Sequence, residues 1–241
     1  MRRIRKGAEP ATLRPHADDP SATWERVRGD ERQALREALF AEQHGLCAYC
    51  LSRLNDPKLR PDPAPSRGGM KIEHFDARKE AGITEAESHR RCFDWSNLLG
   101  VCPGGEDAPP DKRIEGLYCE NVRGNTPLRF NPATFPPDVQ TLLRSTDRGE
   151  LLPAPELGPK QSAPVIAQVE TLKLNVGWLR ENRRQAIAAA RKRLIEQGFK
   201  RGAVEALLRR ASTPDARGLL PDQCVWVEQY LTKKLRQLPP K

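Results

Sequence analysis

The chain has 241 residues, which is long enough for one large or two small domains with a buried core. It carries 41 Lys and Arg against 32 Asp and Glu, a formal net charge of +9, and the excess is unevenly placed. Residues 160–241 hold 17 basic and 7 acidic residues, whereas residues 1–159 hold 24 and 25. A basic C-terminal part favours attraction of a polyanion, with solvated helix faces as the alternative interpretation.

The sequence carries no signal for secretion or membrane insertion. Residues 1–13 are basic but lack the apolar run of a secretory signal. No stretch reaches the roughly 18 to 20 apolar residues that a membrane span needs. We therefore expect a cytoplasmic protein that does not associate with membranes. In a reducing compartment, six cysteines favour metal binding or burial over disulfides.

The N-terminal part is predicted to be an arm followed by one helix. Residues 1–28 are polar and contain proline, which is typical of an arm lying over the surface. Asp30 and Gln33 can cap a helix that runs to about His44, and Gly45 would end it. The predicted apolar face of this helix consists of Leu35, Leu39 and Phe40.

The middle of the chain, residues 46–135, is predicted to consist of short strands and loops. Residues 56–69 and 102–110 are rich in Pro and Gly, which favours loop excursions between fixed points. Residues 152–164 are again rich in proline. We expect this last stretch to separate the middle of the chain from its C-terminal part.

From about residue 163 onward the sequence pattern becomes helical. Apolar residues recur at helical spacing over 172–195, and Gly198 is the expected stop. A short helix is predicted over 203–211 and a last helix over 222–238. The two tryptophans of this part are expected to anchor its core: Trp178 and Trp226.

Four cysteines are candidates for one zinc site. Cys47 and Cys50 form a Cys-x-x-Cys knuckle, a spacing that lets two thiolates bind one tetrahedral zinc ion. Cys102 and Cys119 are predicted to supply the second pair, as a knuckle interrupted by an insertion. A redox motif is the alternative, but such motifs open a helix within a βαβ unit, and no parallel α/β pattern is present. Four thiolates leave no open position for water, so the zinc would be structural.

The remaining cysteines and most histidines have simpler interpretations. Cys92 and Cys224 are expected to be buried as small apolar side chains. His89 is expected to lie solvated in a loop, or to make a minor phosphate contact. His44 would end a helix, where the helix dipole favours a cation, and His16 lies in the arm.

A second set of polar residues lies between and after the cysteines. Glu73 and His74 are adjacent in a short extended run, so their side chains point to opposite faces of a strand. Asn97 follows shortly before the third cysteine of the zinc set. Glu120 and Arg123 come directly after the fourth. A lone Glu-His pair is usually structural, but this order of motifs favours a catalytic site.

In this order the motifs resemble the HNH nuclease family, whose ββα-metal unit is bracketed by zinc knuckles in many members. More closely, the chain is similar to the nuclease subunits of Septu-type anti-phage systems, which act with an ABC/SMC-like ATPase. The resemblance runs over most of the chain. The segments that carry it are residues 46–50, 72–75, 95–99, 119–125, 131–132 and 172–184.

The resemblance implies a role for each residue. His74 matches the general base that activates water, and Glu73 the adjacent ligand of a catalytic Mg²⁺ or Mn²⁺ ion. Asn97 matches the asparagine that holds the turn and the histidine in position. Glu120 stands where the family has another metal ligand, and Arg123 where a lysine suited to phosphate is usual. Both depart from the family pattern.

The resemblance therefore implies an α+β fold with a zinc-bound ββα-metal (HNH) core, flanking helices and an α-helical C-terminal domain. We expect an arm and helix over 1–45, the nuclease domain with its four-cysteine zinc site over 46–151, and a basic helical domain over 152–241. The expected activity is metal-dependent hydrolysis of DNA beside an ATPase partner, without a small-molecule cofactor. The alternatives are an RNA-cleaving nuclease and a zinc-stabilised nucleic-acid-binding or adaptor module without catalysis.

Overall fold

The computed structural model describes residues 1–59, 69–106, 116–135 and 139–239. Most of the predicted loop over 56–69 and the end of the predicted loop over 102–110 lie outside these residues. The described chain combines helices with two small antiparallel sheets, which confirms the α+β class. The elements, in order, are α1 (Arg14–Asp18), η1 (Trp24–Arg26), α2 (Gly29–Glu42), β1 (Lys71–His74), α3 (Glu85–Phe93), η2 (Trp95–Asn97), β2 (Leu98–Val101), α4 (Glu120–Arg123), η4 (Val139–Leu142), β3 (Leu143–Ser145), β4 (Leu151–Pro153), α5 (Pro159–Thr171), α6 (Gly177–Glu196), α7 (Arg201–Ser212) and α8 (Cys224–Arg236).

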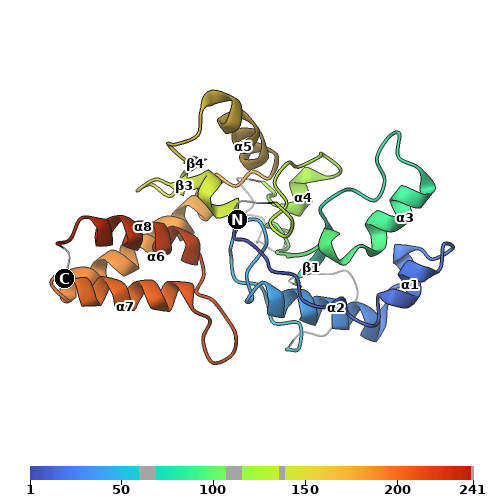
Figure 1. The fold of residues 1–241 in the computed structure, drawn as a ribbon, viewed down its shortest axis with the longest axis horizontal. Helices are drawn as coiled ribbons and strands as arrows, with labels where there is room; N and C mark the ends of the chain where they lie inside the picture. Colours follow the sequence, from blue (N-terminus) through green and yellow to red (C-terminus); the bar gives the residue numbers. More distant parts are fainter. Residues whose placement is uncertain (60–68, 107–115, 136–138, 240–241) are drawn as a thin grey trace.

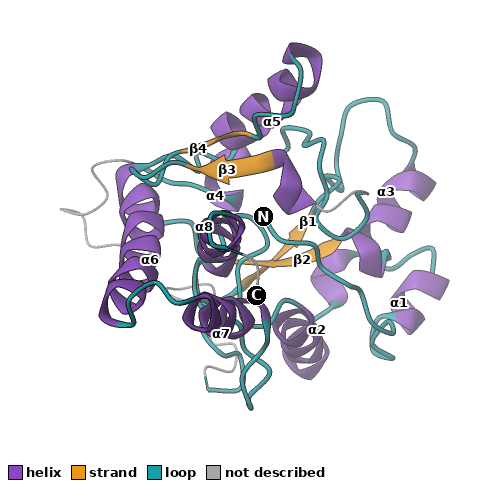
Figure 2. Ribbon diagram, turned by 60° about the vertical axis from the view of Figure 1, so that its left-hand side comes forward, coloured by secondary structure: helices purple, strands orange, loops and turns teal. Residues whose placement is uncertain are grey.

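The elements spread along one axis. Helices α6, α7 and α8 lie side by side at one end, α1 and α3 lie at the other, and β1 and α4 lie between them (Figure 1). Strands β1 and β2 form an antiparallel pair whose long connection contains α3 and η2, and this pair is called the β1–β2 hairpin below. It sits in the middle of the molecule and contacts α2, while the β3–β4 hairpin lies beside α5 (Figure 2). The hairpin that carries the candidate site is therefore covered from several sides.

Helix α2 buries the predicted apolar face but begins differently from the prediction. Leu35, Leu39 and Phe40 are buried as expected. The residue before the helix is Arg28, which makes no capping hydrogen bond, and Asp30 lies inside the first turn. There its carboxylate stabilises the positive end of the helix dipole rather than capping the helix. The helix ends where His44 and Gly45 both adopt positive φ, so the position of the stop is close to the predicted one.

Strands β1 and β2 pair antiparallel with a simple register. Lys71 lies opposite Val101 and His74 opposite Leu98. One more hydrogen bond extends the pairing, from the Phe75 amide to the Asn97 carbonyl, at 2.9 Å. The strand β2 is completely buried, whereas β1 keeps three half-buried residues before His74. Strand β1, rather than β2, is therefore the strand whose polar side chains can take part in chemistry.

The C-terminal part is helical, as its pattern predicts, but the start of the helical region differs. Helix α5 begins at Pro159, inside the proline-rich stretch, and residues 172–176 form a turn before α6. Helix α6 ends just before Gly198, which has a φ of 65° that suits glycine, and α7 and α8 fall close to their predicted bounds. Trp226 is a buried anchor, as expected. Trp178 is 47 % exposed and leans against Tyr118, so the prediction that it is a core anchor is wrong.

The buried apolar residues form two clusters. The larger one gathers α2, the β1–β2 hairpin, the cysteines, α5 and the first turns of α6 and α8. The smaller one joins the far ends of α6, α7 and α8 through Leu194, Val204, Ala211 and Leu231. The larger cluster draws residues from both sides of residue 152, and a domain division there stays a prediction.

The N-terminal segment is more firmly attached than a surface arm. Ile4, Leu13, Trp24 and Val27 are buried in the larger cluster. The amide of Ile4 donates to the Pro132 carbonyl at 2.8 Å. Apolar side chains at intervals along a polar segment are enough to seat it on the core. Within the described ranges, no helix is both long and apolar enough to cross a membrane.

Candidate active site and metal centre

The four cysteines of the predicted zinc site lie together. The Sγ atoms of Cys47, Cys50, Cys102 and Cys119 all fall within 4.8 Å of one another, and all four residues are buried. The Sγ atoms of Cys50 and Cys102 are 3.7 Å apart. Zn–S bonds of about 2.3 Å at tetrahedral angles place sulfur atoms about 3.8 Å apart. The four thiols therefore fit a metal ion such as zinc.

The backbone around these cysteines is arranged for such a site. The amide of Cys102 donates to the Sγ of Cys47 at 3.4 Å, which stabilises a thiolate there. Cys119 has a φ of 55° and directly precedes α4, so the turn that presents its thiol also starts that helix. The remaining cysteines, Cys92 and Cys224, are buried outside this group, as predicted.

A buried arginine from α6 lies close to the cysteines, a feature that sequence patterns did not indicate. Arg183 is fully buried, and its guanidinium donates to the carbonyls of Gly149 at 2.5 Å and Leu174 at 2.7 Å. Its Nη1 atom has no hydrogen-bond partner among the described residues. Burial lowers the pKa of Arg183 to about 10, and Coulombic interaction with the thiolate forms of Cys50 and Cys119 would oppose this shift. The arginine is thus a positive charge beside the thiol group.

Glu73 lies on the face of β1 that meets α4, and its side chain is 12 % exposed. Its carboxylate is paired with the guanidinium of Arg123 and accepts a hydrogen bond from the Tyr49 hydroxyl at 3.3 Å. Tyr49 lies between the first two cysteines, so the zinc knuckle itself supports Glu73. Burial raises the pKa of Glu73 to about 7; the charge of Arg123 opposes this rise and the charge of Glu120 adds to it.

Arg123 does not lie where the resemblance implied. Its side chain is 1 % exposed, and its guanidinium donates to Glu73, to the hydroxyl of Tyr49 and to the carbonyls of His74, Phe75 and Thr126. Because all three guanidinium nitrogens of Arg123 donate hydrogen bonds inside the protein, no surface of the guanidinium is left to contact a phosphate. Arg123 instead fixes the end of β1 and the carboxylate of Glu73.

Glu120 stands beside Glu73, at the start of α4. One carboxylate oxygen, Oε2, is buried without a hydrogen-bond partner among the described residues, and it lies 3.4 Å from the Lys71 ammonium. Lys71 also contacts Glu106 at 2.7 Å and the Asn121 side-chain oxygen at 2.5 Å. Two neighbouring carboxylates and an unsatisfied carboxylate oxygen suit a hard cation such as Mg²⁺ or Mn²⁺.

His74 points to the opposite face of β1, toward α3 and η1. Its Nε2 atom lies 3.1 Å from the Cys92 carbonyl. Since a carbonyl only accepts, Nε2 carries the proton and Nδ1 is the basic nitrogen of the neutral ring. Burial lowers the pKa of His74 to about 3, with the nearby Arg78 charge acting in the same direction. The covered ring is therefore neutral around pH 7, and burial makes it a weaker base than a histidine exposed to water.

Trp24 of η1 covers His74. The two rings meet edge to face with centroids 4.5 Å apart, and His74 is only 8 % exposed. The carbonyl of Asp19 accepts a hydrogen bond from His89 at 2.8 Å, and Glu25 pairs with Arg78 at 3.2 Å. These contacts hold the N-terminal segment over the candidate base. His89 lies on α3 and is engaged in this contact, so the expectation of a solvated loop histidine is wrong.

Asn97 clamps the chain next to His74. Its side-chain oxygen accepts from the Asp76 amide at 2.7 Å, and its amide group donates to the carbonyls of Asp76 at 3.0 Å and Arg91 at 2.8 Å. The side chain thus ties the residues after β1 to the end of α3. This is the contact pattern expected of an asparagine that holds the turn behind the histidine.

The predicted site residues form two groups on the two faces of β1. Glu73, Glu120 and Arg123 gather toward α4, whereas His74 and Asn97 lie toward α3. Sequence reasoning missed three participants: Tyr49, Lys71 and Trp24. The sequence did contain a clue to the first two. Tyr49 stands inside the zinc knuckle, and Lys71 lies two residues before Glu73 on the same strand face. Trp24 had none, since it lies in a segment without helical or strand periodicity.

One curated protein provides a comparison. Over 134 residues, the chain is 31 % identical to a protein of Escherichia coli described as "Retron Ec83 putative HNH endonuclease". The shared region covers 52 % of this chain and 46 % of that protein, so the chain spans about half the length of the relative it matches. No protein-family model matches the chain. The similarity supports a relationship to HNH endonucleases.

Proposed function

We propose that the chain is a metal-dependent HNH endonuclease that hydrolyses phosphodiester bonds of DNA. We further propose that it is the effector of an anti-phage defence complex with an ABC/SMC-like ATPase. The observation that carries the nuclease proposal is the setting of His74. It ends the first strand of a ββα arrangement, its ring nitrogen Nε2 is fixed by a carbonyl, and Asn97 clamps the adjoining turn.

The residues divide the chemistry of phosphodiester hydrolysis between them. His74 accepts the proton of the attacking water at Nδ1, a contribution of roughly 10² to 10⁴ in rate. Glu73 and Glu120 would hold the divalent cation, which when bound neutralises charge on the phosphate and the leaving oxygen. Arg123 and Tyr49 orient Glu73. Lys71 is the half-exposed cation at this face, and we assign to it the phosphate contact that the buried Arg123 cannot make.

The cover over His74 fits an effector that is silent until triggered. His74 is 8 % exposed and the Trp24 ring packs against it, so we propose that η1 and Trp24 move away to admit water and phosphate. A partner that binds the N-terminal segment can therefore switch the site on. We propose that the ATPase has this role.

Plasmid cleavage tests the nuclease proposal. The purified protein is incubated with Mg²⁺ or Mn²⁺, with and without the candidate ATPase, beside His74→Ala and the matched control His44→Ala. His44 lies at the end of α2, where its ring contacts the Gly218 carbonyl. We expect cleavage by the wild type and His44→Ala, and its loss by at least about a hundredfold in His74→Ala. Full activity of His74→Ala with its zinc retained would refute the mechanism.

A zinc-stabilised adaptor without catalysis is the second candidate. Two observations favour it. Both carboxylates already have a cationic partner, Arg123 for Glu73 and Lys71 for Glu120, and His74 lies on the opposite face of β1 from these carboxylates. Binding of Mn²⁺, followed by electron paramagnetic resonance, separates the two. A nuclease binds one Mn²⁺ beyond its zinc and loses it in Glu73→Ala, whereas an adaptor binds none. Parallel assays with RNA identify an RNA-cleaving enzyme.

A further inference from the structure

A broad groove lies away from the β1 strand, between the β3 edge and helices α6 and α8. Its cavity volume is about 1000 Å³. The segment from η4 to β3 forms one wall, and α8 runs along another from Val225 to Gln237. Residues of α6, among them Ile187 and Arg191, close the remaining side. The groove is lined by residues of the segment 140–156 together with residues of the basic C-terminal part, and it shares no lining residue with the candidate active site.

The groove collects cations from three different elements. They are Arg144 of β3, Arg191 of α6, and Lys233, Lys234 and Arg236 of α8. Across the described residues, none of these five side chains is part of an ion pair. Lys234 donates to the Gln237 side chain at 3.2 Å and lies over the ring of Tyr230, and neither contact neutralises its charge.

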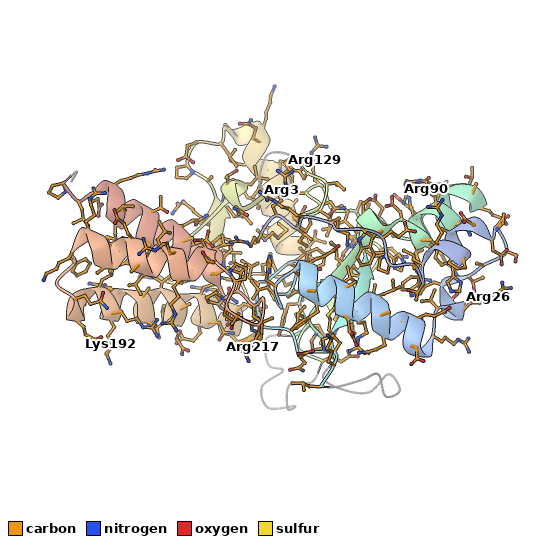
Figure 3. All side chains as sticks on the ribbon, turned by 60° about the horizontal axis from the view of Figure 1, so that its bottom comes forward. Arg3, Arg26, Arg90, Arg129, Lys192 and Arg217 are labelled. Carbon is orange, nitrogen blue, oxygen red and sulfur yellow. The ribbon has the colours of Figure 1, made fainter. Side chains whose placement is uncertain are left out.

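The cations at the opposite end of the molecule behave differently. Figure 3 shows Arg26 and Arg90 projecting at the far end from Lys192. Arg26 pairs with Asp19 at 3.2 Å, and Arg90 pairs with Glu87 at 2.8 Å and Asp94 at 3.0 Å. Their charge is therefore neutralised within the protein. The charge in the groove is not, so basic composition alone does not explain the groove.

The acidic residues of the groove do not cancel its charge. Three line it: Asp147, Glu156 and Glu228. Glu228 is already paired with Arg2 at 2.6 Å, which leaves two carboxylates against five cations. Like charges held around one groove repel one another, and an anion that enters removes this repulsion.

We propose that this groove binds the phosphate backbone of a nucleic acid and holds the substrate while the distant site on β1 cuts it. The inference rests on the proposed function, because a nuclease has a polyanionic partner. Cations on three walls suit a backbone with evenly repeated charges, which can be contacted without reading any base. Non-specific attraction of this kind follows the number of neutralised phosphates and weakens steeply with salt.

Salt-dependent DNA affinity tests the proposal. The binding of a short fluorescent DNA duplex is measured in the His74→Ala background without added divalent cation, so that cleavage does not interfere. The groove variant combines Arg191→Gln, Lys233→Gln and Lys234→Gln. The matched control combines Lys160→Gln, Arg209→Gln and Arg210→Gln, which remove the same charge from exposed positions outside the groove.

We expect the groove variant to bind about tenfold or more weakly at near-physiological salt. Its plot of log affinity against log salt should be shallower by about 3, one for each lost phosphate contact. The control should change both quantities much less. Equal losses in the two variants would overturn the proposal, because net charge would then suffice. Unchanged DNA affinity would also overturn it, and lost ATPase binding in the same variant would make the groove a protein interface.

The test separates this inference from the proposed function. A wild type that never cleaves DNA, yet loses affinity only in the groove variant, would refute the nuclease and support the groove. A wild type that cleaves normally and binds through other surfaces would do the reverse.

Discussion

The two buried clusters of the chain are held together by different means. The larger one surrounds loops and a short strand pair. It contains the four grouped thiols of the candidate zinc site, and the Glu73–Arg123 pair and the buried Arg183 lie beside it. The smaller one is purely apolar, and Leu194, Val204 and Leu231 from three helices form its centre. The difference follows from how the backbone of each region satisfies its hydrogen bonds. Helices satisfy their own hydrogen bonds and need only a stripe of apolar side chains, whereas loops need partners with direction.

The contrast suggests that the two clusters fail separately. A change at the thiols should unfold the hairpin region and leave the far helices intact. A change among the apolar side chains should do the opposite. Three substitutions test this separation, in order of expected effect.

Removal of the metal site should have the largest effect. Cys102→Ser deletes one ligand, and the site's folding free energy is on the order of 10 to 16 kcal/mol when zinc is bound. We expect the variant to lose zinc and the amides of β1 and β2 to lose protection from hydrogen exchange, while α7 and α8 stay protected. Cys92→Ser is the control, since Cys92 is buried outside the thiol group. Simultaneous loss of protection in α7 and α8 would show one cooperative unit and break the comparison.

Removal of the buried guanidinium should have the next largest effect. Arg123→Met leaves Glu73 buried without its cation, and a broken buried pair costs about 3 to 5 kcal/mol. The variant Arg123→Met with Glu73→Gln removes the stranded charge as well and should recover part of this loss. Urea unfolding of the zinc-loaded proteins measures both. A double variant no more stable than Arg123→Met would mean that the carbonyl contacts of Arg123, not its charge, hold the strand end.

A cavity in the helical cluster should have the smallest of the three effects. Leu231→Ala empties a fully buried position and should cost about 2 to 5 kcal/mol. The loss should appear in the helical circular dichroism signal of a thermal scan, with zinc content unchanged. Thr232→Ala, at the half-buried neighbouring position, should be nearly neutral. Zinc loss in Leu231→Ala would join the two clusters and contradict their independence.

The elements that the sequence predicted well are those with short-range causes. Helix α2 has apolar spacing and a glycine end, and the cysteines have knuckle spacing, so both could be located from neighbouring residues. Asn97 makes the local contacts that its predicted role requires, and the role itself stays a prediction. These features depend on local geometry, which spacing records directly.

The parts that the sequence did not predict depend on long-range packing or on a signal that was overlooked. Helix α3 is strongly charged, but Thr84 caps it by accepting from the Glu87 amide at 3.1 Å, and the Thr-x-x-Glu spacing announced that cap. Arg123 ends the short helix α4, whose N-cap residue Cys119 has a positive φ, and its guanidinium reaches residues 49 and 73–75, a long-range contact that no spacing rule reveals. Trp178 sits in the first turn of α6 facing solvent, a position that periodicity alone does not separate from the core.

The contact between Trp24 and His74 determines what fraction of molecules has the histidine uncovered. Exposing one large buried aromatic side chain costs about 3 kcal/mol, and the surface ion pair beside it adds little. Such a gap leaves on the order of 1 % of molecules with the histidine uncovered at any moment. A partner that binds only the uncovered form can raise that fraction by at most its preference for it, roughly a hundredfold before saturation. If His74 is the base of the proposed nuclease, the same tryptophan would set both its resting activity and its maximal stimulation.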